Sequence, residues 1–313
     1  MIFIRRTTDY MDKYIYNVSN MSEDEKKAFV LKCENNFEMQ LKKASQKIID
    51  EDCRIITLSG PTCSGKTTTA ARFISAIEHS GKKVGVISID DFYKARKVLE
   101  KESMERGLDK VDYDSALSID LDYFEECVDG ILEKKTVKLP RYSFEHGNRS
   151  GYYDFDSSRY DRIIFEGIQA VYPEVTEHIH CGFKSVQISV KRDVEVNGSF
   201  FTSRQVRFLR RMIRDAKFRN APPEVTFRMW KGVSENEDLH ILPYNGMYDI
   251  EIDSFMEYEP FMIKKTVEKL LKDIDRSDIF YPKAEEIREK IKGFFEISVD
   301  YLPKESVYRE FLG

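Results

Sequence analysis

The sequence predicts an α/β fold in three layers, with a mostly parallel sheet and helices on both of its faces. Short β-branched apolar runs alternate with longer segments of helical periodicity, which is typical of βαβ units. The runs are apolar throughout, as expected for strands that are buried on both faces. A glycine-rich loop also joins the first of these runs to a helix.

The elements follow from these patterns in chain order. Ser22 and Glu25 have the spacing of a capping box, and apolar residues recur behind them at helical spacing, so a helical segment is expected from 22 to 50. The apolar runs predict strands at 54–59, 84–89, 162–165, 185–190 and 249–252. Helical periodicity predicts helices at 65–80, 119–132, 202–219 and 258–274, and a tail that is helical after Pro282.

These elements suggest a division of the chain. We expect an N-terminal helical extension at 1–50 and a P-loop kinase domain at 51–275, which includes a helical lid at about 200–235. We expect the residues at 276–313 to form a C-terminal helical tail that packs on this domain.

Composition excludes several classes of protein. No apolar run approaches the ~18 residues of a membrane-spanning helix, and no secretory signal is visible at the N-terminus. A net charge of -5 argues against a chain that binds nucleic acid over its whole surface. The five cysteines form no CxxC pair, so we expect reduced thiols, no zinc site and a cytoplasmic location.

The loop after the first predicted strand reads Gly-Pro-Thr-Cys-Ser-Gly-Lys-Thr and matches G-x-x-x-x-G-K-[ST] in full. Its glycines let successive backbone N–H groups face an anion, and the following helix adds the positive end of its dipole. In such loops the Lys side chain reaches the β- and γ-phosphates, and the hydroxyl of the next residue ligates Mg²⁺. The residues expected to bind the nucleotide here are Gly60, Pro61, Thr62, Cys63, Ser64, Gly65, Lys66, Thr67 and Thr68.

Two acidic residues follow later strands. Asp90 comes after the 84–89 run, where a carboxylate can accept a proton from an attacking hydroxyl and bind Mg²⁺. Glu166 follows the 162–165 run, at the position of an acid that organises magnesium and water. Ligands of parallel sheets lie at the carboxyl ends of the strands, so we expect both acids near the loop. Solvated turns or a helix cap remain the alternative roles.

The residues at 207–219 form the densest basic stretch. Arg207, Arg211 and Arg214 fall at i, i+4 and i+7 and share one face of the predicted helix, with Arg210 beside them. A basic face in an acidic protein suggests an anionic ligand. A solvated face with some affinity for nucleic acid is the alternative. No Asn-Lys-x-Asp segment is present, so a GTPase is not expected.

With these motifs the sequence resembles the uridine kinase and phosphoribulokinase family of P-loop kinases, over roughly 51–311. The resemblance implies that ATP and Mg²⁺ are the cofactors and that the γ-phosphate goes to a nucleoside hydroxyl, with the 5′-hydroxyl of uridine or cytidine as the first expectation. It implies that Asp90 is the catalytic base and that Thr67, Asp90 and Glu166 hold the metal. Family members often form dimers or tetramers, so a homo-oligomer is also compatible with the sequence.

The resemblance also implies roles in acceptor binding and in the lid. Asp112 would hold the ribose, and Tyr93, Tyr142 and Phe144 would line the acceptor site, the last two flanking the base. In the lid, Arg207 and Arg211 would act in catalysis together with Lys66. Arg210 and Arg214 would bind the phosphates of ATP, and Arg214 and Arg219 would bind the acceptor.

Two departures from the family pattern concern the acceptor. Gly147 stands where many uridine kinases carry a His that reads the pyrimidine, and Ser143 replaces an Asp. Another nucleoside or a sugar phosphate is therefore an alternative acceptor. A non-catalytic NTP-sensing module, which binds nucleic acid or a partner through the basic helix, is the alternative from a different class. We expect a small-molecule acceptor and neither a membrane nor nucleic acid as a partner.

Overall fold

The computed structural model describes residues 13–16, 21–51, 53–108 and 111–313. At its centre lies a five-stranded sheet in the order β10-β7-β2-β6-β3. Every neighbouring pair of these strands is parallel, and all five coincide with predicted strands, so the mostly parallel sheet is confirmed. The strands span Ile55–Ser59 (β2), Val84–Ser88 (β3), Arg162–Glu166 (β6), Phe183–Ser189 (β7) and Ile250–Asp253 (β10).

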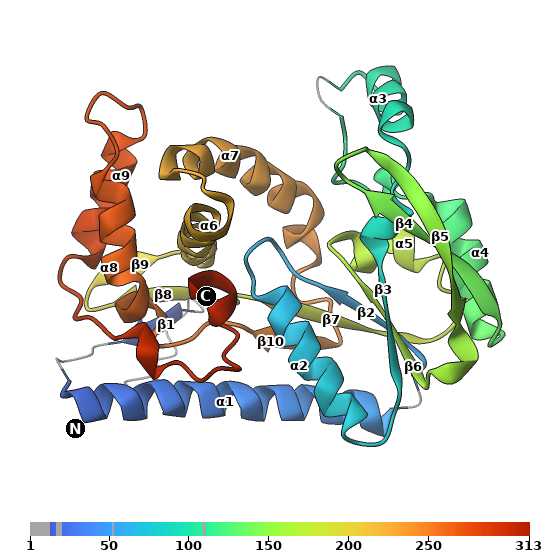
Figure 1. Cartoon of the computed structure of the whole chain (residues 1–313), viewed down its shortest axis with the longest axis horizontal. Helices are drawn as coiled ribbons and strands as arrows, with labels where there is room; N and C mark the ends of the chain where they lie inside the picture. Colours follow the sequence, from blue (N-terminus) through green and yellow to red (C-terminus); the bar gives the residue numbers. More distant parts are fainter. Residues whose placement is uncertain (1–12, 17–20, 52, 109–110) are drawn as a thin grey trace.

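Helices surround this sheet (Figure 1). They span Glu23–Asp50 (α1), Lys66–Glu78 (α2), Arg96–Glu105 (α3), Leu121–Leu132 (α4), Pro173–Thr176 (α5), Ser203–Arg219 (α6), Pro223–His240 (α7), Glu259–Lys272 (α8), Tyr281–Ile291 (α9) and Arg309–Leu312 (α10). The region at 22–50 is thus one helix, α1, which begins at the predicted capping box of Ser22 and Glu25. No helix in the described ranges has the length and apolar character needed to cross a membrane.

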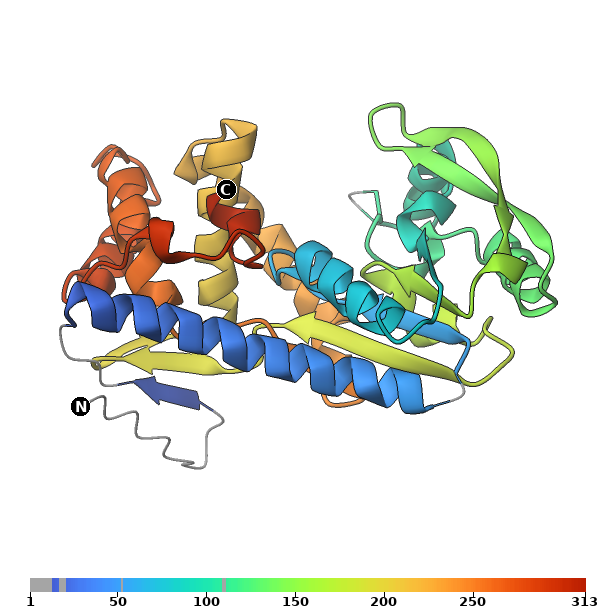
Figure 2. The same cartoon turned by 60° about the horizontal axis from the view of Figure 1, so that its bottom comes forward.

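Successive residues of the central strands face two separate apolar cores. Ile56 and Leu58 of β2 belong to one core, together with side chains of α1, α2, α6 and α8. Ile55 and Ile163 belong to the other core, together with side chains of α4 and α5. Figure 2 shows α1 running along the length of the molecule, and it packs against α2 and β10. The three-layer prediction is therefore confirmed.

Several elements were not predicted. The strands Thr136–Ser143 (β4) and Asn148–Asp156 (β5) form an antiparallel hairpin that packs on α4. A second small sheet has the order β1-β8-β9, built from Lys13–Tyr16 (β1), Asp193–Val196 (β8) and Ser199–Phe201 (β9). The helices α3 and α7 were also missed.

Two expectations about the ends of the chain need correction. The extension at 1–50 was expected to be helical, but β1 is a strand that pairs in parallel with β8; residues 1–12 and 17–20 lie outside the described residues. The tail is helical only in α9 and α10, apart from a short 3-10 turn at Val299–Tyr301. The domain boundaries themselves remain predictions.

The helices α6 and α7 occupy the segment at about 200–235, and the role of this segment as a lid stays a prediction. α6 ends at Asn220, whose φ of 49° is left-handed, a conformation that Asn tolerates better than most residues. Two prolines follow, and α7 begins with Pro223 in its first turn. The segment at about 200–235 therefore consists of two helices joined by a tight turn, and α6 packs on both α7 and α10.

Candidate active site

The phosphate loop turns the chain from β2 into α2. A Cβ on Gly60 would lie 2.2 Å from the carbonyl oxygen of Ile188, so only glycine fits there. Gly65 precedes α2 with a φ of 81°, which glycine adopts without strain. The hydroxyl of Ser64 is buried and has no hydrogen-bond partner. The loop thus leaves a buried polar atom free at the place where the motif binds an anion.

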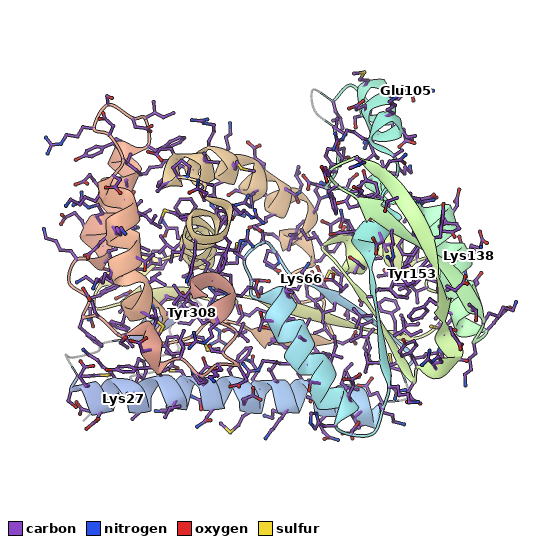
Figure 3. All side chains as sticks on the ribbon, in the orientation of Figure 1. Lys27, Lys66, Glu105, Lys138, Tyr153 and Tyr308 are labelled. Carbon is purple, nitrogen blue, oxygen red and sulfur yellow. The ribbon has the colours of Figure 1, made fainter. Side chains whose placement is uncertain are left out.

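Lys66, Glu166 and Asp90 come together at the carboxyl ends of β2, β6 and β3. Lys66 begins α2 (Figure 3), and its Nζ lies 3.8 Å from Oε2 of Glu166. Ser88 Oγ donates a hydrogen bond of 3.3 Å to Oε1 of Glu166. Asp90 lies in the 3-10 turn Ile89–Phe92, directly after β3. The expected convergence of the loop with both acids is therefore present in the structure.

Burial and neighbouring charges raise the pKa of the Asp90 carboxyl group. Burial is the largest cause that raises its pKa above the ordinary value, and the negative charges of Glu166 and Asp91 raise it further. The positive charge of Lys66 acts in the opposite direction but does not cancel the rise. A carboxylate with a raised pKa is a better proton acceptor than an ordinary aspartate. The environment therefore suits the role expected for Asp90.

The oxygen atoms of Thr67, Asp90 and Glu166 are the ligand type that Mg²⁺ prefers. The mutual repulsion of the Asp90 and Glu166 carboxylates, seen in the raised pKa of Asp90, would be relieved by a cation. No group of three metal-binding side chains from His, Cys, Asp and Glu exists among the described residues. Mg²⁺ often binds one or two carboxylates and completes its shell with water and phosphate oxygens, so these residues fit the ion.

Arg207, Arg210 and Arg211 of α6 are buried, and the first two contact the phosphate loop. Arg210 is fully buried, and its five N–H donors all have protein acceptors. The Glu259 carboxylate accepts two of these hydrogen bonds, and Nη1 of Arg210 donates to the carbonyl oxygen of Cys63 at 3.4 Å. Arg207 pairs with Glu237 at 2.5 and 2.7 Å and donates to the carbonyl oxygen of Thr62. Both side chains therefore contact backbone of the loop.

Three further arginines of α6 share one acidic residue. Arg211 Nε, Arg214 Nη2 and Arg219 Nη1 lie 3.2 to 3.3 Å from the carboxylate oxygens of Asp215. One negative charge thus faces three positive charges. The pKa of the Cys63 thiol is raised by burial, and the charges of Arg214 and Arg211 oppose this rise. This places the excess positive charge next to the phosphate loop, where an anion would be stabilised.

Three aromatic rings form a cluster near the carboxyl end of β3. The ring centroids of Tyr142 and Phe144 are 5.1 Å apart, and Tyr93 lies 5.5 and 5.6 Å from them. The Phe144 side chain is 57% exposed, whereas Tyr93 is buried. The backbone N–H of Tyr142 donates to Oδ1 of Asp91, the neighbour of Asp90. The structure therefore brings the three expected acceptor residues to the candidate base.

Asp112 is engaged within its own loop. Its carboxylate accepts hydrogen bonds from the backbone N–H groups of Asp114 and Ser115, from the Ser115 hydroxyl and from Arg106. Burial would raise the pKa of Asp112, but these hydrogen bonds outweigh it and hold the pKa below its ordinary value. To bind a ribose, Asp112 would have to share or exchange these partners.

Sequence reasoning missed four residues that shape this site. Glu237 and Glu259 hold Arg207 and Arg210, and their distance along the chain from α6 gave no signal. Arg96 of α3 donates to the carbonyl oxygen of Phe144 at 3.0 Å and packs on Gly147, where a Cβ would lie 2.6 Å from its Nε. Glu310 accepts hydrogen bonds from Thr68 at the start of α2.

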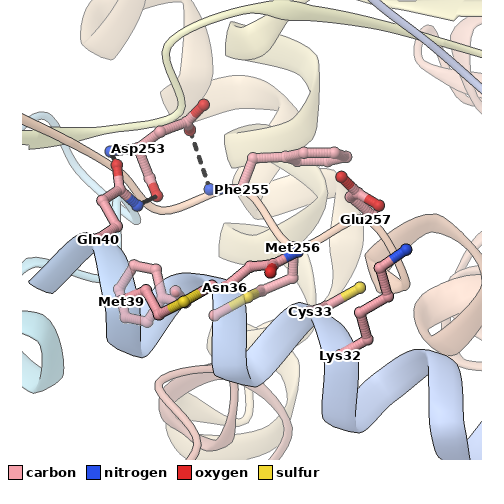
Figure 4. A pocket seen from close by; sticks show the side chains of 10 residues that line it. Lys32, Cys33, Asn36, Met39, Gln40, Asp253, Phe255, Met256 and Glu257 are labelled. Carbon is pink, nitrogen blue, oxygen red and sulfur yellow. Dashed lines mark hydrogen bonds between the residues drawn. The ribbon is translucent and has the colours of Figure 1, made fainter. Parts of the chain in front are cut away.

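The loop after β10 is held by α1. The side-chain amide of Gln40 donates to the carbonyl oxygen of Asp253 and accepts from its N–H, at 2.8 Å each. Asp253 Oδ1 accepts from the N–H of Phe255 (Figure 4). A cavity of about 560 Å³ lies between this loop and α1. Ser254, between these two residues, contacts Arg210, so α1 supports the phosphate loop from a distance.

Comparisons with known proteins cover the part of the chain that carries most of this site. The family model "Phosphoribulokinase / Uridine kinase family" matches residues 55–259. A uridine kinase of Ureaplasma urealyticum serovar 10 is 29% identical over 190 residues, which are 60% of this chain and 82% of that protein. A uridine kinase of Ureaplasma parvum serovar 3 is 30% identical over 190 residues, with the same shares of 60% and 82%.

A solved structure, described as a possible uridine kinase from Bacillus stearothermophilus, is 15% identical. It covers 70% of this chain and 100% of its own, with a TM-score of 0.46. The range matched by the family model includes the phosphate loop, Asp90, Glu166 and the basic helix α6, whereas α1 and Glu310 lie outside it.

Proposed function

This chain belongs to the phosphoribulokinase and uridine kinase family and is therefore a phosphotransferase that acts on a hydroxyl group, and we propose that it transfers the γ-phosphate of Mg²⁺-ATP to a nucleoside. The 5′-hydroxyls of uridine and cytidine are the first candidate acceptors. The single observation that carries the proposal is the convergence of Lys66, Glu166 and Asp90 at the mouth of the phosphate loop.

Each part of the site has a role in the proposed reaction. The loop amides and Lys66 bind the phosphates, and Thr67, Asp90 and Glu166 would hold Mg²⁺, which supplies positive charge to the phosphate oxygens when bound. Asp90 orients the acceptor hydroxyl and removes its proton as the oxygen attacks. Arg211 and Arg214 stabilise negative charge that develops on the transferred group.

The two arginines that contact the phosphate loop act in a different way. Because Arg210 has no N–H donor left over, we propose that it acts through the carbonyl oxygen of Cys63 rather than by contacting phosphate. Arg207 acts likewise through the carbonyl oxygen of Thr62. Both fix the curvature of the loop. This fits the general finding that phosphoryl transfer depends mainly on positioning and charge.

The test is ADP release by the purified protein with Mg²⁺-ATP and a panel of nucleosides and sugar phosphates. We expect uridine or cytidine to stimulate release, and Asp90→Asn to reduce turnover by about 10²–10⁴-fold, the usual contribution of a general base. Asp122→Asn is the matched control, because Asp122 is exposed in the first turn of α4. Turnover of Asp90→Asn within a few-fold of wild type would contradict the role of Asp90.

Arg96 favours a second acceptor class. It brings a positive charge to the aromatic cluster, and this charge acts on the Tyr142 hydroxyl, whose pKa is raised mainly by burial. The Arg96 side chain lies against the backbone of Gly147, at the position where the uridine kinase pattern has a base-reading His. An acceptor that bears its own phosphate would pair with this cation. Stimulation by a sugar phosphate and by no nucleoside would favour this candidate.

A further inference from the structure

The Glu310 carboxylate accepts hydrogen bonds from Thr68, which directly follows the phosphate-loop motif. Oε2 of Glu310 accepts a hydrogen bond of 3.2 Å from the backbone N–H of Thr68 and one of 2.9 Å from its hydroxyl. Thr68 lies in the first turn of α2, where the backbone N–H groups have no acceptor within the helix. Such N–H groups, together with the helix dipole, bind anions. A carboxylate of this chain therefore stands where the motif places a nucleotide phosphate.

The segment at 305–313 holds this carboxylate in place. Val307 packs on the loop, with its Cγ1 3.1 Å from the position of a Cβ on Gly65. The rings of Tyr308 and Phe311 lie 5.6 and 5.0 Å from the guanidinium carbon of Arg210 (Tyr308 is labelled in Figure 3). Lys217 of α6 donates to the carbonyl oxygen of Leu312. Val307, Tyr308, Phe311 and Leu312 are all buried, whereas the Glu310 side chain is only partly buried.

One set of donors cannot serve two anions at the same time. Building on the proposed function, in which Thr68 binds the nucleotide, we propose that Glu310 is an internal competitor that must leave Thr68 before the nucleotide phosphates bind. The buried neighbours of Glu310 remain in place, and only its side chain rotates away. The segment at 305–313 thereby lowers the affinity for nucleotide without closing the site.

The expected change in the Kd for nucleotide depends on the fraction of molecules in which Glu310 is hydrogen-bonded to Thr68. A ligand that needs a minor state binds more weakly in proportion to the population of that state. If Glu310 covers Thr68 in about 70–90% of molecules, its removal tightens the apparent Kd about three- to tenfold. A plain helix cap would behave differently, because its removal would lower stability and leave the affinity for phosphate unchanged or weaker.

The experiment is calorimetric titration of the full chain with ADP in the presence of Mg²⁺. We expect Glu310→Gln and Glu310→Ala to bind ADP about three- to tenfold more tightly than wild type. Glu305→Gln is the matched control: it removes the same charge from an exposed position in the same segment, and we expect its Kd to stay within about twofold, because Glu305 has no contact with Thr68. Adenosine lacks phosphates, so its affinity should not respond to Glu310.

The outcomes separate this inference from the proposed function. If wild type binds ADP and both Glu310 variants bind it equally or more weakly, the competition is refuted and the nucleotide site stands. Tighter binding by Glu305→Gln of the same size would also refute it, because the effect would then be one of general charge. If neither wild type nor the Glu310 variants bind ADP, both proposals fail. Binding by the variants alone would be the strongest support.

Discussion

Asp90 shows how one residue can be tuned by its neighbours. The neighbours that raise its pKa are Glu166 and Asp91, while Lys66 lowers it, and burial adds the largest rise. Proton acceptance requires the ionised form, so activity falls as the pH falls through the raised pKa. The acid limb of the pH profile should therefore lie at a higher pH than an ordinary aspartate would give.

Asp91→Asn tests this environment without touching the reacting atoms. The substitution removes one negative neighbour and keeps an oxygen that can accept from the Tyr142 N–H. The pKa of Asp90 should fall, so we expect the acid limb of kcat/KM to move to lower pH. The measurement is the pH profile of kcat/KM, with Asp122→Asn as the control. An unmoved limb, or one that moves to higher pH, would show that Asp91 does not tune Asp90.

At the scale of elements, α6 and α8 are joined by a buried ion pair. Arg210 and Glu259 are both buried, and each satisfies the charge of the other. A buried pair adds little net stability compared with apolar residues of similar shape, but the loss of one partner leaves an unpaired charge. The pair also reaches the phosphate loop through Cys63, so it links the packing of two helices to the shape of the site.

A double-mutant cycle measures this link. Arg210→Met should lower the free energy of unfolding by about 3–5 kcal/mol, because Glu259 is left buried without a partner. Arg210→Met combined with Glu259→Leu should recover part of that loss. Urea unfolding provides the measurement. Arg219→Met is the control, expected within about 0.5 kcal/mol, because the Arg219 side chain is 58% exposed. A double mutant less stable than Arg210→Met would refute this account.

At the scale of the whole molecule, α1 connects parts that lie far apart in sequence. Its Glu34 accepts hydrogen bonds from the Tyr258 hydroxyl at 2.6 Å and from the Ser306 hydroxyl at 2.5 Å. Oε2 of Glu34 also lies 3.9 Å from Nη1 of Arg72 in α2. The buried Glu34 carboxylate thus connects α1 to Tyr258, the residue before α8, and to Arg72 in α2. It also connects α1 to Ser306, in the segment that carries Glu310.

Glu34→Ala should therefore destabilise the molecule strongly. It leaves two buried hydroxyls without their acceptor, and we expect the free energy of unfolding to fall by about 2–4 kcal/mol. Glu38, one turn further along α1, also pairs with Arg72, but its side chain is 40% exposed. Glu38→Ala should cost less than about 1 kcal/mol. Chemical denaturation of both variants provides the measurement, and equal losses would contradict the central position of Glu34.

Local patterns explain which elements could be predicted. The strands of the central sheet are apolar along their whole length, and the phosphate loop is a contiguous motif, so both are visible in a short window of sequence. The hairpin β4–β5 was missed because Pro140 lies within β4 and argues against a strand. In α7 only Pro223, Thr226, Phe227 and Glu237 are buried, so the helix carries little apolar periodicity.

The contacts that complete the site are non-local, and no spacing rule reveals them. Glu259 is 49 residues from Arg210, and Glu310 is 242 residues from Thr68. The basic stripe of α6 was visible as a helix face, but the arginines that contact the phosphate loop are selected by Glu237 and Glu259, which lie outside α6. The sequence therefore indicates which residue types form the candidate site, but not which contacts each of them makes.

The contact between Glu310 and Thr68 has a consequence for the order of synthesis. Thr68 is made 242 residues before Glu310. At about 5–20 residues per second, the ribosome needs roughly 12–48 s to cover that distance. During this interval the start of α2 has no internal carboxylate to receive its N–H groups. The residues that shape the loop extend along the chain to Glu259, which is made before Glu310. Under the proposed competition, a growing chain therefore carries an uncontested phosphate loop only in the last part of this interval, between the synthesis of Glu259 and that of Glu310.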